Sequence, residues 1–157
     1  MEEITQQDIL VDLEPQLVQA SSGKRLANYF IDLILFYIIF FIAGMIIATV
    51  SPEMLENDTL FSDHVFLDRL FSLLLFGVYM SVIEGIFKGR TLGKLITGTK
   101  AVNADGSTIS FATALSRGFS RVVPFEPFSA LGNPPYPWHD KWTNTYVIDI
   151  RQSTLES

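Results

Sequence analysis

GKRLANYFIDLILFYIIFFIAGMIIATV, residues 23–50 of the 157-residue chain, is the stretch that decides the fold. Its last 18 residues, 33–50, carry neither a formal charge nor a proline. At about 1.5 Å per residue they form roughly 27 Å of helix, which is close to the thickness of the hydrocarbon core of a bilayer. The stretch therefore predicts a transmembrane helix over residues 26–50.

A second apolar stretch lies between Arg69 and Lys88. The two side chains can place their charges in opposite head-group layers, across an apolar interval of 18 residues. We predict a second transmembrane helix over residues 69–87, joined to the first by a loop over residues 51–68. Two spans with a short connection form an antiparallel hairpin.

Small residues recur on one face of each predicted span. Gly77 and Ser81 are four residues apart in the second span, and Gly44 and Ala48 are four apart in the first. Residues four apart lie on the same face of a helix, and small side chains there let a neighbouring backbone approach closely. These faces predict surfaces for helix packing.

The net charge of −6 is unevenly distributed along the chain. Acidic residues fill the segment between the predicted spans, whereas lysine and arginine lie before the first span and after the second. By the positive-inside rule, residues 1–22 and 88–157 are expected in the cytoplasm, and the acidic loop is expected outside. The chain lacks the concentrated basic face that nucleic-acid binding needs, so no nucleic acid is expected as a partner.

Several kinds of catalytic or cofactor site are disfavoured by the sequence. The chain has no cysteine, which excludes thiolate chemistry and cysteine-ligated metals. Its two histidines, His64 and His139, are predicted on opposite sides of the membrane, which argues against a metal site built from both. GRTLGK at residues 89–94 differs from a phosphate-binding loop, because three residues instead of four separate Gly from Gly-Lys. We therefore expect no cofactor, no metal and no enzymatic activity.

Residues 111–123 have the pattern of an amphipathic helix, with apolar residues on one face and Arg117 and Arg121 on another. A third span would need about 20 residues. Such a window would include both arginines, Glu126 and two prolines. We therefore predict that residues 111–123 form an interfacial helix on the cytoplasmic side of the membrane.

Two short stretches in the cytoplasmic half predict strands. Residues 100–102 precede a turn at Asp105-Gly106, and residues 145–150 are suited to pair with them. The predicted fold class is an all-α membrane protein: a two-span antiparallel transmembrane hairpin with a cytoplasmic interfacial amphipathic helix and a short β unit. We expect a single domain over residues 1–157.

Charged residues near the inner ends of the two spans form the strongest candidate site. Arg25 and Asp32 are seven residues apart, which is two helical turns less about 20°, so they face the same way and are expected to pair. Asp32 lies about 7 Å inside the predicted inner boundary of its span, and Glu84 about 6 Å inside that of the second span. The predicted cluster contains three cations and three carboxylates: Arg25, Asp32, Glu84, Arg117, Arg121 and Asp140.

Two interpretations of this cluster stay open at the level of the sequence. In the first, it is an ion-pair network that docks the cytoplasmic elements onto the hairpin, because charges inside a membrane normally need partners. In the second, Asp32 or Glu84 binds a proton or a cation during transport. The two interpretations are compatible.

The order of the motifs carries a resemblance to a known family. Arg25 is followed seven residues later by Asp32, Glu84 precedes the Gly-x-Thr-x-Gly-Lys turn, and His139-Asp140-Lys141 follows in the C-terminal part. This arrangement, over residues 21–150, resembles the RDD family of small bacterial membrane proteins, named after one arginine and two aspartates. The resemblance implies that Arg25, Asp32 and Asp140 are the three residues of the name. It also implies a structural motif of Gly89, Thr91, Gly93, Lys94 and His139.

The resemblance implies a role in transport, and cation/proton exchange has been proposed for some relatives. Two spans in one protomer cannot enclose a pathway, so transport requires a homo-oligomer or another membrane protein as partner. We expect a multi-pass subunit of an ion or solute transport assembly in the bacterial inner membrane, with a monovalent cation or a proton as ligand. The alternative is a non-catalytic scaffold or accessory subunit that binds another membrane protein through its charged inner-leaflet cluster.

Overall fold

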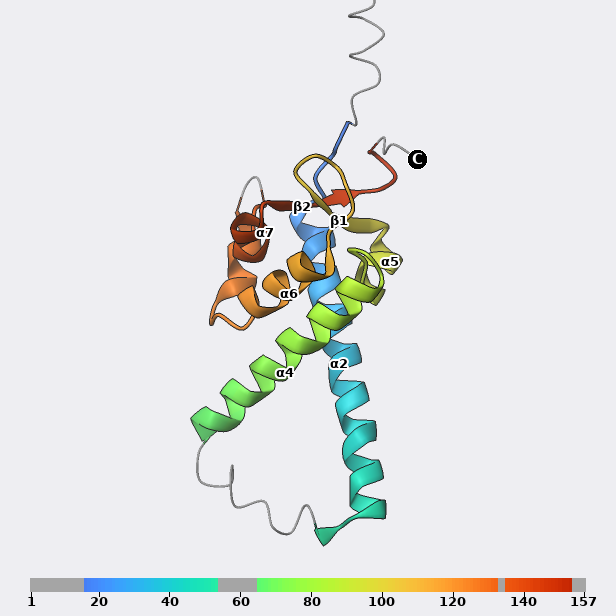
Figure 1. Cartoon of the computed structure of the whole chain (residues 1–157), viewed down its shortest axis with the longest axis vertical. Helices are drawn as coiled ribbons and strands as arrows, with labels where there is room; N and C mark the ends of the chain where they lie inside the picture. Colours follow the sequence, from blue (N-terminus) through green and yellow to red (C-terminus); the bar gives the residue numbers. More distant parts are fainter. Residues whose placement is uncertain (1–15, 54–64, 133–134, 154–157) are drawn as a thin grey trace, which may run out of the picture.

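The computed structural model describes residues 16–53, 65–132 and 135–153. Most of the predicted cytoplasmic lead-in, residues 1–15, and residues 54–64 of the predicted acidic loop lie outside the described residues. The described parts are mostly helical, with a small sheet of two strands (Figure 1).

Helix α2, Ser22–Val50, is the longest element, with 29 residues. Its amino end is capped, because the Ser21 hydroxyl accepts a hydrogen bond from the backbone amide of Lys24 at 3.4 Å. The helix ends at Val50. Its capping residue, Ser51, lies directly before Pro52, which cannot continue the hydrogen-bond ladder of a helix. The apolar pattern therefore forms one uninterrupted helix.

Helix α4, Val65–Ile86, is the second long apolar element and has 22 residues. It begins four residues before the predicted boundary at Arg69, so Asp68 lies in its first turn. By length and composition, both helices can cross a membrane. Only 6% of the most apolar window of α2 and 22% of that of α4 is buried, whereas the core helix of a soluble protein is mostly buried.

The two long helices run side by side only near the start of α2 and the end of α4, and they diverge towards residues 50 and 65 (Figure 1). Their apolar contact is a small cluster of buried residues, Phe36, Phe76 and Met80. The rings of Phe36 and Phe76 meet edge to face with centroids 5.3 Å apart. Beyond Phe36, all residues of α2 are exposed. The predicted hairpin is therefore packed at one end and open at the other.

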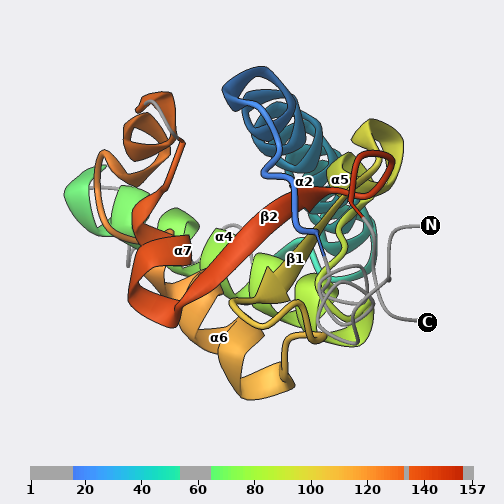
Figure 2. The ribbon, with the colours of Figure 1, turned by 90° about the horizontal axis from the view of Figure 1, so that it is seen from above.

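Two strands pair in the position that the sequence predicts. Strand β1, Thr99–Asn103, is antiparallel to β2, Thr145–Asp149, with Ala101 opposite Val147. The chain before α2 extends this unit, because Gln19 forms an isolated bridge with Ile148. Seen from above, β2 passes between α2 on one side and α6 on the other (Figure 2).

In the described part of the chain, four short helices surround the start of α2 and the end of α4. Helix α5, Leu92–Thr97, packs against α2 and leads into β1. Helix α6, Phe111–Ser120, ends three residues before the predicted boundary at residue 123. A 3-10 helix, η1, Glu126–Leu131, and helix α7, Trp138–Thr143, complete the cap.

The small residues of α4 pack against α6. A Cβ atom added to Gly118 of α6 would lie 1.9 Å from Ser81 Oγ and 2.5 Å from the carbonyl oxygen of Gly77. The Ser81 hydroxyl donates to that carbonyl at 2.8 Å. A Cβ atom added to Gly44 of α2, by contrast, would have no neighbouring atom within 4 Å among the described residues. One of the two predicted packing surfaces is therefore used within the chain, and the other is not.

Candidate functional site

Glu84 lies at the centre of a buried ion-pair network. Its carboxylate is fully buried and accepts hydrogen bonds from Arg117 Nη2 at 3.2 Å and from Arg121 Nη1 at 3.1 Å. The ammonium group of Lys94 forms a third, very close ion pair with it. One carboxylate on α4 thus holds cations from α5 and from the carboxyl end of α6.

Asp140 is the second buried carboxylate of the network. Arg117 Nη1 donates to Asp140 Oδ1 at 2.6 Å, and Arg25 Nη1 pairs closely with Asp140 Oδ2. Burial alone would raise the pKa of Asp140, but Arg117, His139 and Arg25 outweigh it and hold that pKa below its usual range. Arg117 therefore bridges Glu84 and Asp140, and it joins α4, α6 and α7.

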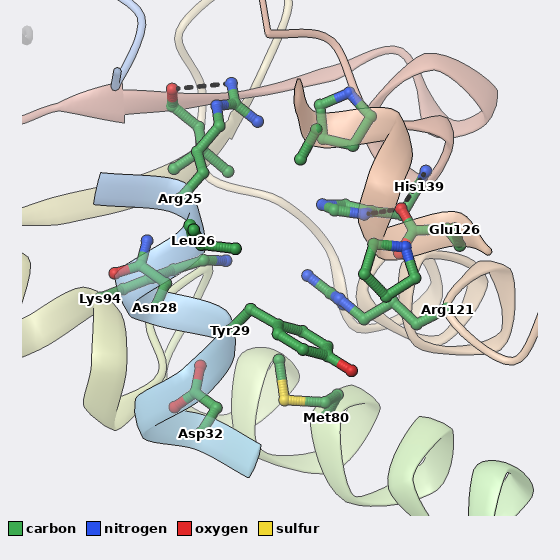
Figure 3. A pocket seen from close by; sticks show the side chains of 14 residues that line it. Arg25, Leu26, Asn28, Tyr29, Asp32, Met80, Lys94, Arg121, Glu126 and His139 are labelled. Atoms are coloured by element: carbon green, nitrogen blue, oxygen red, sulfur yellow. Dashed lines mark hydrogen bonds and ion pairs between the residues drawn. The ribbon is translucent and has the colours of Figure 1, made fainter. Parts of the chain in front are cut away.

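The predicted pairing of Arg25 with Asp32 is wrong. The guanidinium of Arg25 points towards the cap, where Nη2 also donates to the carbonyl oxygen of Val147 at 3.2 Å (Figure 3). Asp32 is bound by the start of α5: the Thr91 hydroxyl donates to it at 2.6 Å, and the backbone amide of Gly93 donates at 2.9 Å. Spacing on one helix predicts a shared face, but it does not predict which neighbouring element reaches each side chain.

The Gly-x-Thr-x-Gly-Lys turn makes this arrangement possible. Gly89 has φ +91°, and a Cβ there would lie 2.2 Å from the carbonyl oxygen of Ala101, so the position requires glycine. At Gly93, a Cβ would lie 2.6 Å from the carbonyl oxygen of Asn28, which shows how closely α5 approaches α2. Thr91 caps α5 by accepting from the amide of Lys94 at 3.3 Å.

Lys94 lies inside the charge cluster, whereas its sequence motif predicted only a structural role. Its side chain is 3% exposed. Burial lowers the pKa of Lys94 to about 8, because loss of hydration outweighs the attraction of Glu84. For Arg117 the balance is reversed: burial opposes its charge, but Glu84 and Asp140 together raise its pKa above the usual value.

A second pair, Glu126 and His139, lies beside the network, and the sequence motifs did not predict Glu126 as part of the site. His139 Nδ1 lies 2.5 Å from Glu126 Oε1, and His139 Nε2 lies 3.4 Å from Asp140 Oδ1. Burial lowers the pKa of His139, and Arg121 adds to this. Glu126 could have been predicted from its position, because it is the one charged residue between Arg121 and Pro137.

A cavity of about 60 Å³ lies between α2 and η1, next to these groups. Figure 3 shows Tyr29 of α2 reaching towards Arg121, Glu126 and His139, while Asp32 lies on the side of α2 with its carboxylate turned towards the start of α5. Because one water molecule takes about 30 Å³ in the liquid, the cavity has room for water or a small ion. The cavity thus brings the predicted residue Asp32 together with the unpredicted residue Glu126.

The remaining chemistry of the site is that of charge and hydrogen bonding. Within the described ranges, no group of three or more histidine and acidic residues is placed to hold a metal ion. The same part of the chain contains one buried side-chain polar atom without a hydrogen-bond partner, Arg117 Nε. The arrangement can stabilise buried charges and can bind or exchange a proton or a small cation.

Comparison with known proteins agrees with the motifs. The model of the RDD family matches residues 19–148, which confirms the resemblance stated from the sequence. No curated protein and no solved structure matches the chain. The two apolar helices and the family together indicate a membrane protein. With a match that covers most of its length, including Arg25, Asp32 and Asp140, the chain belongs to the RDD family.

Proposed function

We propose that the chain is a non-enzymatic subunit of a transport assembly in the bacterial inner membrane, and that it handles a proton or a monovalent cation at Asp32. One observation carries this proposal. Asp32 is 1% exposed and lines the cavity, and among the described residues its carboxylate is bound by a hydroxyl and a backbone amide but by no cation.

Burying a carboxylate without a directly bound cation is costly, and a proton or a small cation would neutralise it. The cations that line the cavity form their ion pairs with other carboxylates: Lys94 and Arg121 with Glu84, and Arg25 with Asp140. Glu84 and Asp140 are already paired and serve as the fixed part of the site. Asp32 is therefore the exchangeable part.

The proposal places the inner ends of α2 and α4 in the cytoplasmic leaflet, with both chain termini in the cytoplasm. Lysine and arginine near these ends support that orientation. Because α2 and α4 diverge, one protomer does not enclose a pathway, and a second copy or another membrane protein completes it (Figure 1).

The test is proton flux in proteoliposomes driven by a gradient of sodium or potassium. Asp32→Asn keeps the size of the side chain, and its amide can accept from the Gly93 amide and donate to the Thr91 hydroxyl, so we expect the fold to be retained and the flux to be lost. Asp68→Asn is the matched control, because Asp68 is exposed near the opposite end of α4 and should leave the flux unchanged. Wild-type flux no greater than that of Asp32→Asn and of empty vesicles would refute the proposal.

A second candidate function, a non-catalytic scaffold or accessory subunit, is favoured by the surface of α2. Residues 37–50 are exposed, and Gly44 has open space around it in the described part of the chain. A small residue on an apolar helix allows close approach of another helix.

Disulfide formation tests the homo-oligomeric form of this candidate, since the chain has no cysteine of its own. In vesicles under mild oxidation, Gly44→Cys should give a covalent dimer, whereas Ile46→Cys, about 200° away on the helix, should not. Purification in mild detergent tests the other form and should yield a second protein in fixed stoichiometry. A chain that stays monomeric and alone in both experiments contradicts this function.

A further inference from the structure

The segment of residues 111–132, which contains α6 and η1, has an unusual outer surface. Its three charged residues, Arg117, Arg121 and Glu126, are all buried. Its large exposed side chains are all apolar and each at least 49% exposed: Phe111, Phe119, Phe125, Phe128 and Leu131. A surface in water normally carries the charged residues of a segment, whereas this one carries none.

The buried charges of the segment are paired inside the molecule. Arg117 binds Glu84 and Asp140, Arg121 binds Glu84, and Glu126 contacts His139. Charged residues at membrane depth face the interior and pair with one another in this way. In the sequence, these three charges were the reason to predict that the segment does not enter the membrane. In the structure, they are turned away from any surrounding lipid.

The contacts between α6 and α4 show how far the segment extends along α4. A Cβ added to Gly85 would lie 2.4 Å from the ring of Phe111, and one added to Gly77 would lie 2.6 Å from Val122 and 3.0 Å from the carbonyl oxygen of Gly118. Gly85 and Gly77 are eight residues apart, or about 12 Å along the helix. Helix α6 thus runs alongside α4 from its inner end towards its middle.

The chain then returns to the cap at α7. Glu126 of η1 lies against His139, and the backbone amide of Trp138 donates to the Ser129 hydroxyl at 3.0 Å. The segment therefore enters and leaves on the same side of the molecule. Its apolar surface continues onto exposed side chains of α4 at the same level, including Val78 and Val82.

We propose that residues 111–132 form a re-entrant membrane segment whose outer surface is covered by lipid acyl chains. This position is deeper than the interfacial one that the sequence predicts for residues 111–123. Continuity with the exposed apolar surface of α4, itself long and apolar enough to span a bilayer, identifies lipid as the occupant. The buried ion pairs then have a further consequence: they make a segment with three charges compatible with hydrocarbon.

Nitroxide labels on single cysteines test the proposal, because the chain has no native cysteine. The probe positions are Phe119→Cys on α6 and Phe128→Cys on η1, in the full chain reconstituted in vesicles of phosphatidylcholine and phosphatidylglycerol. Ile42→Cys, exposed on α2, is the reference for lipid, and Asp105→Cys, in an exposed turn, is the reference for water. Collision rates with oxygen and with a water-soluble nickel chelate are measured for each label.

At both probe positions we expect frequent collisions with oxygen and a loss of collisions with the nickel chelate, as at Ile42→Cys. Collisions with nickel as frequent as at Asp105→Cys would place the segment in water and overturn the proposal. Loss of collisions with both reagents would show that protein covers the surface, which also overturns it. Only variants that keep the melting temperature of the unlabelled chain are used, and the two positions lie on separate elements, so each reports independently.

Discussion

Arg117 shows how much of the site depends on single side chains. It is fully buried, and it divides its guanidinium between Glu84 on α4 and Asp140 on α7. It also donates to the Thr145 hydroxyl at the start of β2. A planar group with several fixed donors suits this bridging position, whereas a lysine could not reach all three acceptors.

Arg25 gives a prediction at this scale. Arg25→Ala removes one of the two arginines on Asp140 and leaves that carboxylate buried, so we expect a loss of about 3 kcal/mol in stability and a lower yield of folded protein. Arg90→Ala is the control, because Arg90 lies outside the cluster. Folded yields are compared by size-exclusion chromatography in detergent. Equal yields for the two variants would contradict the assignment of Arg25 to Asp140.

His139 gives a prediction of pH dependence. Its pKa is lowered by burial in the folded state, so the unfolded chain binds a proton near pH 6.5 before the folded chain does. The melting temperature in detergent should therefore fall as the pH falls below about 6.5. His139→Gln should flatten this dependence between about pH 6.5 and 5, and His64→Gln should leave it unchanged. A pH profile of His139→Gln that matches the wild type would contradict this prediction.

At the scale of the elements, the contact between α4 and α6 positions the network. Glycine at residues 77 and 118 lets the two helices approach until the Ser81 hydroxyl lies between their backbones. This approach brings Arg117 and Arg121 within reach of Glu84. The geometry of the charge cluster therefore depends on a contact between α4 and α6 that involves no charged residue.

Gly118→Ala tests that contact. The added Cβ would lie 1.9 Å from Ser81 Oγ and 2.5 Å from the carbonyl oxygen of Gly77, so α6 must move away from α4. We expect a loss of about 1–3 kcal/mol in stability. Gly23→Ala is the matched control, since nothing lies within 4 Å of its added Cβ, and it should not destabilise the helix. Thermal unfolding in detergent compares them; equal melting temperatures would show that the contact is not tight.

The elements were more predictable than their contacts. Apolar length predicted both long helices, and β-propensity predicted the pairing of β1 with β2. These features depend on residues that are close in sequence. The partners of Arg25 and Asp32, the inclusion of Lys94 and the burial of Glu126 depend on how short helices dock, which local patterns do not encode.

At the scale of the whole molecule, the cap contains a balanced set of charges. Among the described residues, those around the network and the cavity include four buried cations and four buried carboxylates: Arg25, Lys94, Arg117, Arg121, Asp32, Glu84, Glu126 and Asp140. They come from α2, α4, α5, α6, η1 and α7, with Arg121 as the residue that ends α6. A fifth buried carboxylate, Asp149, pairs with Lys24 outside this group. Balance, more than any one pair, keeps these charges stable out of water.

A double-mutant cycle tests this balance. Glu84→Gln leaves Lys94, Arg117 and Arg121 close together without their shared carboxylate, so we expect a loss of about 3–5 kcal/mol. Adding Lys94→Met removes one of the unbalanced cations, and the double variant should be more stable than Glu84→Gln alone. Thermal unfolding of the four proteins in detergent gives the coupling. Additive losses would show that the two charges act independently.

The bridge formed by Arg117 also bears on the order of events during synthesis. Glu84 is made 33 residues before Arg117, and Arg25 is made 115 residues before Asp140. A nascent chain that has just completed β1 therefore holds Glu84 with Lys94 alone, and Arg25 without its carboxylate. The two long helices reach the ribosome exit well before the residues that neutralise their inner ends. The ion-pair network can therefore close only after Asp140 has been made, because both Arg25 and Arg117 bind it.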